Sequence, residues 1–264
     1  MTTDHKFEAA EFEIARKYCA AGDADSLRKL VAGFGLGADF AKRDNNALIA
    51  TAIKHGHVNV MMLLRDVGEI TLEDISSCRV SHGWPVAVAP VAALKTLRKV
   101  WGASARTLPA DRTTALLVSA FEKRKGEREA IVELLVNWEF DIKSLAADNA
   151  APIKVLVKSS APADVAILKA FRHHFALEKG VSLPEAIDNK VVASNILRAA
   201  ITRGNLAMIE ELREWGFSHE SVGTEKTLKI IAEHEHGVEM LRILRGAAAS
   251  DSRDLSARPR HSEE

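Results

Sequence analysis

The feature that most constrains this chain is the stretch 45–68, NNALIATAIKHGHVNVMMLLRDVG. Leu48 and Ala52 are four residues apart, which puts them on one face of a first helix. Gly56 interrupts the pattern, and a second helix then carries an apolar stripe: Val60, Met61, Leu63 and Leu64. Gly68 follows this stripe, where a left-handed C-terminal cap favours glycine. Each helix is too short to be stable alone, so we expect the unit to stack on similar units.

Related units recur along the chain. The run from a turn glycine into an apolar stripe begins at Gly22, Gly56 and Gly204, and looser forms begin at Gly126 and Gly237. Ahead of the turn, a Leu or Ile precedes an Ala by four residues at Leu48/Ala52, Leu116/Ala120, Ile196/Ala200 and Leu228/Ala232. The second helix closes on an apolar residue and a glycine at Phe34-Gly35, Val67-Gly68, Trp101-Gly102 and Trp215-Gly216. The period of these units is about 33 residues.

Residues 37–68 resemble an ankyrin repeat, and residues 194–216 resemble a second one. Extended through the recurring turns, the resemblance implies an all-α, ankyrin-like helical solenoid of about seven stacked helix-turn-helix repeats. The family's Thr-Pro-Leu-His motif is replaced here, for example by Asn46-Ala47-Leu48-Ile49, and its Asp-Gly hairpin tip is missing. We expect a flexible N-terminus over residues 1–7, one repeat domain over 8–246 and a disordered tail over 247–264.

Local signals mark the turns and helix starts. Asp23 or Asp25 is expected to cap the second helix of the first repeat. Thr71 and Asp74 have the spacing of a capping box at the start of the third repeat. Gly56 and Gly204 are expected to have positive φ, a conformation that residues with a Cβ adopt only at a cost.

Relative to the family, residues 84–90 (WPVAVAP) are an insertion in the third repeat. Its two prolines exclude it from a helix interior, so it is expected to form a loop. Trp84 and Val86 give the loop two possible roles. They contribute to partner recognition, or they fill a poorly packed third repeat.

Charge and composition exclude several classes of protein. Lys plus Arg and Asp plus Glu both number 36, so the net charge is zero, unlike the strongly basic balance of nucleic-acid binders. The longest apolar run, residues 84–94, is interrupted by prolines and is far shorter than the roughly 20 residues of a membrane span. We expect no secretory signal at the N-terminus, and two cysteines offer no disulfide framework. We expect a cytoplasmic protein that binds neither nucleic acid nor a membrane.

The sequence contains none of the usual catalytic motifs: no phosphate-binding glycine loop, no His-Glu-x-x-His and no Gly-x-Ser-x-Gly. His234 and His236 are two residues apart, so on a helix they point to different faces. We expect no catalytic residues, no cofactor, no metal and no small-molecule substrate. Trp101, Trp138 and Trp215 share the end of the second helix. They are expected to pack against the next repeat, and a ligand-stacking ladder is the alternative.

The ankyrin resemblance implies a non-catalytic adaptor or scaffold that binds a protein partner through its concave face and loop tips. Together with the insertion, the positions that match those places form the candidate partner-binding set: Lys42, Arg43, Asp44, Asn45, Trp84, Val86, Arg106, Asp111, Arg112, Asp188, Asn189 and Lys190. Two alternatives are a structural subunit of a larger assembly, and an enzyme or metal protein built on a helical array.

Overall fold

The computed structural model describes residues 4–78, 84–123, 128–159, 161–175, 182–218 and 225–245. Throughout these residues the regular structure is helical, and no strand is formed. None of the described helices is long and apolar enough to cross a membrane. The elements are α1 (Asp4–Ala21), α2 (Ala24–Phe34), α3 (Ala38–Ala41), α4 (Arg43–His55), α5 (Val58–Gly68), α6 (Leu72–Ser77), the 3-10 helix η1 (Pro85–Val88), α7 (Val91–Trp101), α8 (Ala110–Lys123), α9 (Arg128–Val136), α10 (Ile142–Lys158), α11 (Pro162–Phe175), α12 (Leu183–Ala186), α13 (Lys190–Thr202), α14 (Leu206–Glu214), α15 (Glu225–Glu233) and α16 (Gly237–Arg245).

The chain divides into two compact units, Met1–Val155 and Leu156–Glu264, where the sequence predicted one domain over 8–246. The dividing point lies within α10, near its C-terminal end. Helix α1 begins at Asp4, earlier than the predicted start at residue 8. The predicted tail, 247–264, lies outside the described residues.

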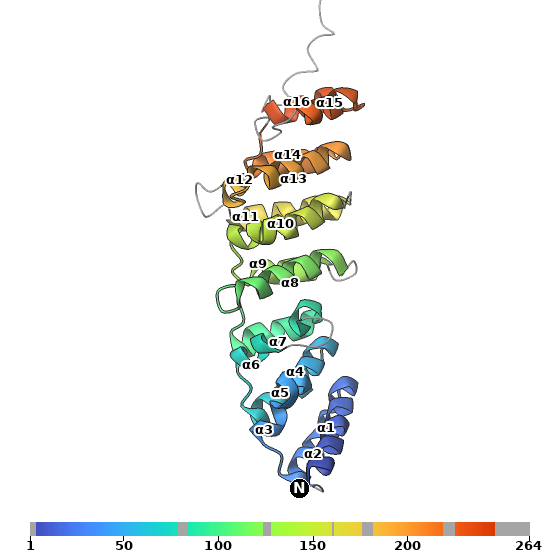
Figure 1. Ribbon diagram of the computed structural model, residues 1–264, viewed down its shortest axis with the longest axis vertical. Coiled ribbons are helices and arrows are strands. Elements are labelled where there is room, and N and C mark those ends of the chain that lie inside the picture. The colour runs from blue at the N-terminus through green and yellow to red at the C-terminus, as the bar shows by residue number, and fades with distance from the viewer. Residues whose placement is uncertain are drawn as a thin grey trace, which may run out of the picture. The chain divides into compact units, whose positions relative to one another are not determined.

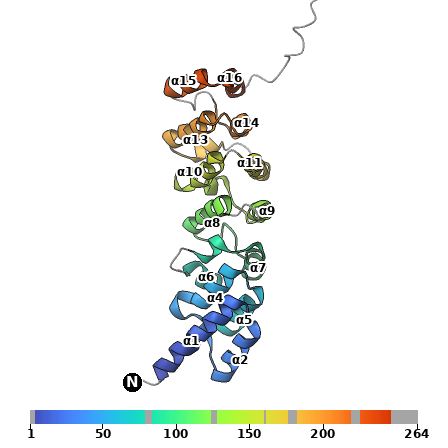
Figure 2. The same cartoon turned by 90° about the vertical axis from the view of Figure 1, so that its right-hand side faces the viewer.

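In the first unit, consecutive helices pack in pairs: α1 with α2, α4 with α5, and α8 with α9. Successive pairs also contact each other, since α1 packs on α4 and α2 packs on α5. Helices α5, α7 and α9 continue the layer that α2 begins, and Figure 2 shows them on one side of α4 and α8. In the first unit the first helices therefore form one layer and the second helices another, and Figure 1 shows the successive pairs from α1 to α9 in chain order.

The third pair is built differently from its neighbours. Helix α6 has only six residues and starts with the expected capping box, in which the Thr71 hydroxyl accepts from the N–H of Asp74 at 3.1 Å. The chain then reaches η1, which packs against both α4 and α8. A short α-helix and a 3-10 turn thus occupy the place that one long first helix fills in the other pairs.

The second unit repeats the same arrangement with fewer helices. Helix α13 packs with α14, and α15 packs with α16. Helix α11 contacts α14, α14 contacts α16, and α13 contacts α15. At the contact between α11 and α14, Arg172 Nε donates to Glu211 Oε1 at 2.6 Å, and Glu211 is buried at 5% exposure. The charge on Glu211 is therefore compensated by a directly bonded guanidinium.

The turn glycines have the predicted left-handed conformation. Gly56 has φ of 77° and Gly204 has φ of 64°, which confirms the expectation for both. A ring from farther along the chain covers each turn. An added Cβ would lie 2.8 Å from Pro90 Cγ at Gly56 and 2.5 Å from His234 Cε1 at Gly204. At Gly22 it would lie 2.6 Å from His57 Nδ1, and the Nε2 of that ring lies 3.0 Å from the carbonyl oxygen of Ala20.

Four helix pairs can be aligned by a hydrogen bond at the start of the second helix. The carbonyl oxygen of the residue after the turn accepts from the N–H four residues later, at 3.0 to 3.2 Å, in each pair: Asp23, His57, Asn205 and His236. This alignment corrects the sequence comparison by one residue in the last pair. Leu228 corresponds to Leu197 and not to Ile196.

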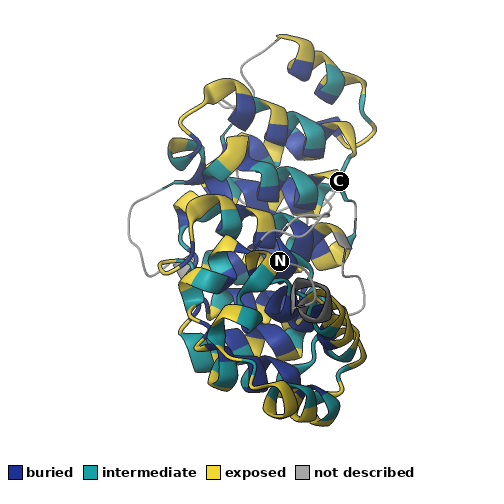
Figure 3. Ribbon diagram, turned by 60° about the horizontal axis from the view of Figure 1, so that its bottom comes forward, coloured by how far each residue is buried: buried dark blue, intermediate teal, exposed yellow. Residues whose placement is uncertain are grey.

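Burial at the aligned positions follows the place of the pair in its unit. Eight residues before the aligning residue, Ala15, Ile49 and Leu197 are all fully buried, whereas Leu228 in the last pair is 53% exposed. Nine residues before it, Leu48, Ile196 and Thr227 are at most 1% exposed, whereas Ile14 in the first pair is 40% exposed. The first position thus faces the following pair and the second faces the preceding pair. Buried residues alternate with exposed residues along the helices in Figure 3.

Candidate functional site

The predicted loop tips contain turns of three consecutive residues with positive φ, which the sequence analysis did not predict. Before the regular part of α4, Asp44, Asn45 and Asn46 all have left-handed φ values, of 54°, 56° and 64°. Asp148, Asn149 and Ala150 repeat the same conformation within α10, at 48°, 54° and 58°. In both turns the first two residues are exposed and the third is buried. Asp and Asn tolerate this conformation best among residues with a Cβ, because their short polar side chains can bond locally.

The turn at Asp148 was absent from the candidate set, although the sequence contains a signal for it. Residues 44–47 read Asp-Asn-Asn-Ala and residues 148–151 read Asp-Asn-Ala-Ala. The shared Asp-Asn-x-Ala pattern would have identified the second turn.

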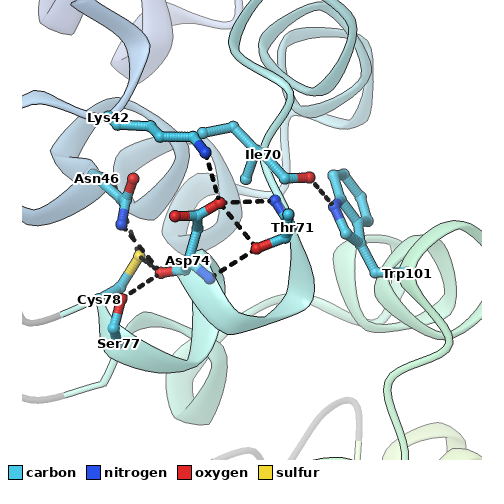
Figure 4. A network of polar contacts seen from close by, with 8 residues as sticks. All are labelled: Lys42, Asn46, Ile70, Thr71, Asp74, Ser77, Cys78 and Trp101. Atoms are coloured by element: carbon cyan, nitrogen blue, oxygen red, sulfur yellow. Dashed lines mark hydrogen bonds and ion pairs between the residues drawn. The ribbon is translucent and has the colours of Figure 1, made fainter. Parts of the chain in front are cut away.

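Asp74 joins the start of the second pair to the start of the third (Figure 4). Its Oδ2 accepts from the Thr71 N–H and hydroxyl, both at 2.8 Å, and pairs with Lys42 Nζ at 3.1 Å. Its carbonyl oxygen accepts from Asn46 Nδ2 at 3.1 Å and from Ser77 Oγ at 2.9 Å. One residue therefore fixes both the capping of α6 and the position of the left-handed turn.

The electrostatics of this network favour charged Asp74 and neutral Cys78. Partial burial raises the pKa of Asp74, but the hydrogen bonds from Thr71 and the Lys42 ammonium outweigh it and leave the pKa below its ordinary value. Burial raises the pKa of Cys78 to about 12, helped by the nearby Asp74 charge. Burial raises the pKa of Cys19 to about 12 as well. Because nucleophilic cysteines act as thiolates, neither thiol is suited to covalent chemistry at neutral pH.

The basic candidates of the first unit are engaged with other parts of the fold. Lys42 pairs with Asp74, and the Arg43 guanidinium lies 5.7 Å from the centre of the Phe12 ring. Arg106 lies 3.4 Å from a Glu139 carboxylate oxygen.

Asp111 and Arg112 lie side by side at the start of α8. Their side chains approach to 3.6 Å, and the Asp111 carboxylate is 77% exposed. The Arg112 guanidinium lies 5.7 Å from the centre of the Trp84 ring, within the range of a cation–π contact. Arg112 therefore belongs to the packing of the third pair as well as to the surface.

The structure places Trp84 and Val86 in the core rather than on a binding surface. They are 4% and 1% exposed, and the Trp84 indole N–H donates to the carbonyl oxygen of Ile75 at 3.2 Å. Apolar side chains are drawn inward here because η1 must fill the space between α4 and α8. The filling role thus fits residues 84–90, and we remove Trp84 and Val86 from the candidate surface.

The candidates of the second unit cluster at the start of α13. Asp188 is exposed with φ of 40°, and Lys190 is exposed as the first residue of the helix. Asn189 is exposed and caps the helix, since its Oδ1 accepts from the N–H groups of Val191 and Val192 at 3.1 Å. Asn189 is therefore needed for the helix end, while Asp188 and Lys190 are available to a partner.

The three tryptophans at the ends of second helices are packed to different extents. Trp138 is fully buried and Trp215 is 5% exposed. The half-buried Trp101 donates its indole N–H to the carbonyl oxygen of Ile70 at 2.8 Å. These environments agree with the packing role.

Among the described residues, no group of three or more His, Cys, Asp or Glu side chains is placed to hold a metal ion. His234 and His236 have ring centres 5.7 Å apart, and the N–H of His236 donates to His234 Nδ1. This bond closes the turn that precedes α16.

No protein-family model, no curated protein and no solved structure matches the chain.

Proposed function

We propose that this chain is a degenerate array of ankyrin-like repeats that acts as a non-catalytic protein-binding module. Three features support the repeat arrangement: the paired helices, the ring-covered glycine turns, and burial that changes only in the first and last aligned pairs. Each aligned helix pair would be one repeat, which stacks on the next by its first and second helices.

The observation that carries the binding function is the repeated Asp-Asn turn. Each residue with a Cβ costs roughly 1–2 kcal/mol in the left-handed conformation, and each turn contains three such residues in succession. Packing accounts for the third residue, which is buried, but not for the first two, which are exposed. Strained backbone that is retained at an exposed site is typical of functional positions.

The exposed charge at these turns favours a basic partner. Asp44 and Asp148 are exposed, whereas the Lys42 ammonium is paired with Asp74 and Arg43 lies over an aromatic ring. The exposed Asp44 and Asp148 carboxylates could each be complemented by a Lys or Arg side chain of a partner segment. Lys190 adds a basic group beside Asp188 at the corresponding place in the second unit.

Neutralising the turns tests the proposal. The variant Asp44→Asn/Asp148→Asn removes two charges and keeps a residue that tolerates positive φ. The control variant Asp66→Asn/Glu133→Gln removes two exposed charges from α5 and α9, in the layer of second helices. Both variants and the parent chain are immobilised, and bound proteins from the native cell are quantified by mass spectrometry at low and high salt.

We expect a protein that the parent and the control retain, that high salt releases, and that the turn variant loses by about tenfold or more. Equal retention by all three chains would exclude the turns as the binding site. If the parent retains nothing above an unrelated immobilised protein, the binding function itself is wrong.

A further inference from the structure

Exposed large apolar side chains are concentrated in the first and last helix pairs. In the first pair Ile14 is 40% exposed and Phe34 is 61% exposed. In the last pair Leu228 is 53% exposed and Val238 is 77% exposed. Val191, at the start of α13, is another large apolar side chain that is exposed, at 70%. Single exposed apolar residues are common, but this distribution has a structural cause.

The cause is found at the aligned positions of the first helices. In α15, Leu228 and Ala232 are exposed, although the matching residues of the other aligned pairs are fully buried. We call these two residues the following face. In α1, Ile14 is exposed and Tyr18 is half-buried, although the matching residues of the other pairs are buried. We call these two residues the preceding face.

Within the first unit the two kinds of face meet. Helix α1 packs on α4. On the α1 side, the residues at the following-face positions are Ala15 and Cys19, and both are fully buried. On the α4 side, the residues at the preceding-face positions are Leu48 and Ala52, and both are also fully buried. The exposed following face on α15 therefore corresponds to the buried α1 residues, and the exposed preceding face on α1 corresponds to the buried α4 residues. The two exposed faces are complementary in the same way as α1 and α4.

We propose that two copies of this chain associate head to tail, with the following face of one copy on the preceding face of the other. The contact continues the packing that joins α1 to α4, with Leu228 and Ala232 in the place of Ala15 and Cys19. The proposal uses only this packing between neighbouring pairs, so it holds or fails independently of the binding function proposed above. Because the two faces differ, each dimer keeps one face of each kind and can add further copies.

Three single substitutions test the contact in the full chain. Ile14→Glu blocks the preceding face and Leu228→Glu blocks the following face. Val191→Glu places the same charge at an exposed apolar side chain outside both faces. All three side chains are exposed, so the fold is expected to persist, and circular dichroism checks it. Sedimentation velocity over a concentration series then measures self-association. Should a Glu variant unfold, the uncharged Ile14→Gln or Leu228→Gln replaces it.

We expect the parent chain and Val191→Glu to associate with rising concentration, and each face variant alone to associate at least about tenfold more weakly. The decisive measurement is an equimolar mixture of Ile14→Glu and Leu228→Glu. Ile14→Glu retains a following face and Leu228→Glu retains a preceding face, so the mixture should form dimers that stop at two copies.

Three outcomes would overturn the proposal. The parent chain could remain monomeric at all concentrations, which would show that a second copy does not cover the two faces. One face variant could associate alone as strongly as the parent, which would indicate a contact between two identical faces. The mixture could fail to form dimers that the parent forms.

Discussion

Replacing Gly204 by Ala should destabilise the second unit by more than the backbone conformation alone explains. Gly204 has φ of 64°, and left-handed φ costs alanine about 1 kcal/mol. The new Cβ would also lie 2.5 Å from Cε1 of His234, whose Nδ1 accepts from the N–H of His236 and is thereby held in place. Forcing a methyl group into a packed site costs about 1–3 kcal/mol. The expected total is about 2–4 kcal/mol.

Gly35 provides a matched control. It has the same φ of 64°, but an added Cβ would meet no heavy atom of the described chain within 4 Å. Gly35→Ala should therefore lower the stability only by the cost of positive φ for alanine, about 1 kcal/mol. Because a chain of two units need not unfold in one step, hydrogen exchange read by mass spectrometry is the better assay. For Gly204→Ala we expect faster exchange in α13 and α15, whereas for Gly35→Ala a smaller change should appear in α2.

The double variant Gly204→Ala/His234→Ala separates the two contributions. With the ring removed, only the backbone share of about 1 kcal/mol should remain for the glycine substitution in that background. If Gly204→Ala is as mild as Gly35→Ala, or if its cost is unchanged without the ring, the ring does not enforce the glycine.

Three further predictions concern the first unit. Because the pKa of Asp74 is lowered in the folded chain, its carboxylate stabilises the fold above the unfolded pKa, near 3.9, and this contribution is lost as pH falls through the folded pKa. The urea midpoint should therefore fall further between pH 6 and pH 3 for the parent than for Asp74→Asn. Trp84→Ala should lower the opening free energy that hydrogen exchange reports for α4 and α8 by about 3–5 kcal/mol, because it empties a core site and leaves the carbonyl of Ile75 without its indole donor. A cost below about 1 kcal/mol would contradict the filling role. Cys19 and Cys78, whose pKa burial raises to about 12, should resist a thiol reagent at pH 8 in the native chain and react when urea is added.

Much of the helical structure could be predicted because local rules determine it. The period of the apolar residues predicted the helices, and positive φ at Gly56 and Gly204 followed from their place between two apolar stripes. The cap at Asp23, whose Oδ1 accepts from the N–H of Ser26 at 2.9 Å, followed from the preference of helix N-termini for short polar side chains. Such features depend on residues within one turn of each other, so a single sequence contains the necessary information.

The candidate surface was harder to predict because exposure depends on contacts between pairs. An apolar insertion looks the same in sequence whether it lies on the surface or in the core. The burial of Trp84 depends on η1 taking the place of a long first helix between α4 and α8. In the same way, the engagement of Lys42 requires Asp74, which is 32 residues away in the chain. The second Asp-Asn turn was within reach of sequence comparison, through the shared Asp-Asn-x-Ala pattern.

The rings over the turn glycines explain how helix pairs of unequal length can coexist in one chain. A turn and the ring that covers it are separated by 35 residues at Gly22 and His57, by 34 at Gly56 and Pro90, and by 30 at Gly204 and His234. The contact requires only that the ring lies over the turn, and it does not fix the number of residues between them. The three spacings show that the same covering contact forms across connections of different length. Pro90 illustrates the point, since it belongs to the inserted segment and yet covers Gly56 as His57 covers Gly22.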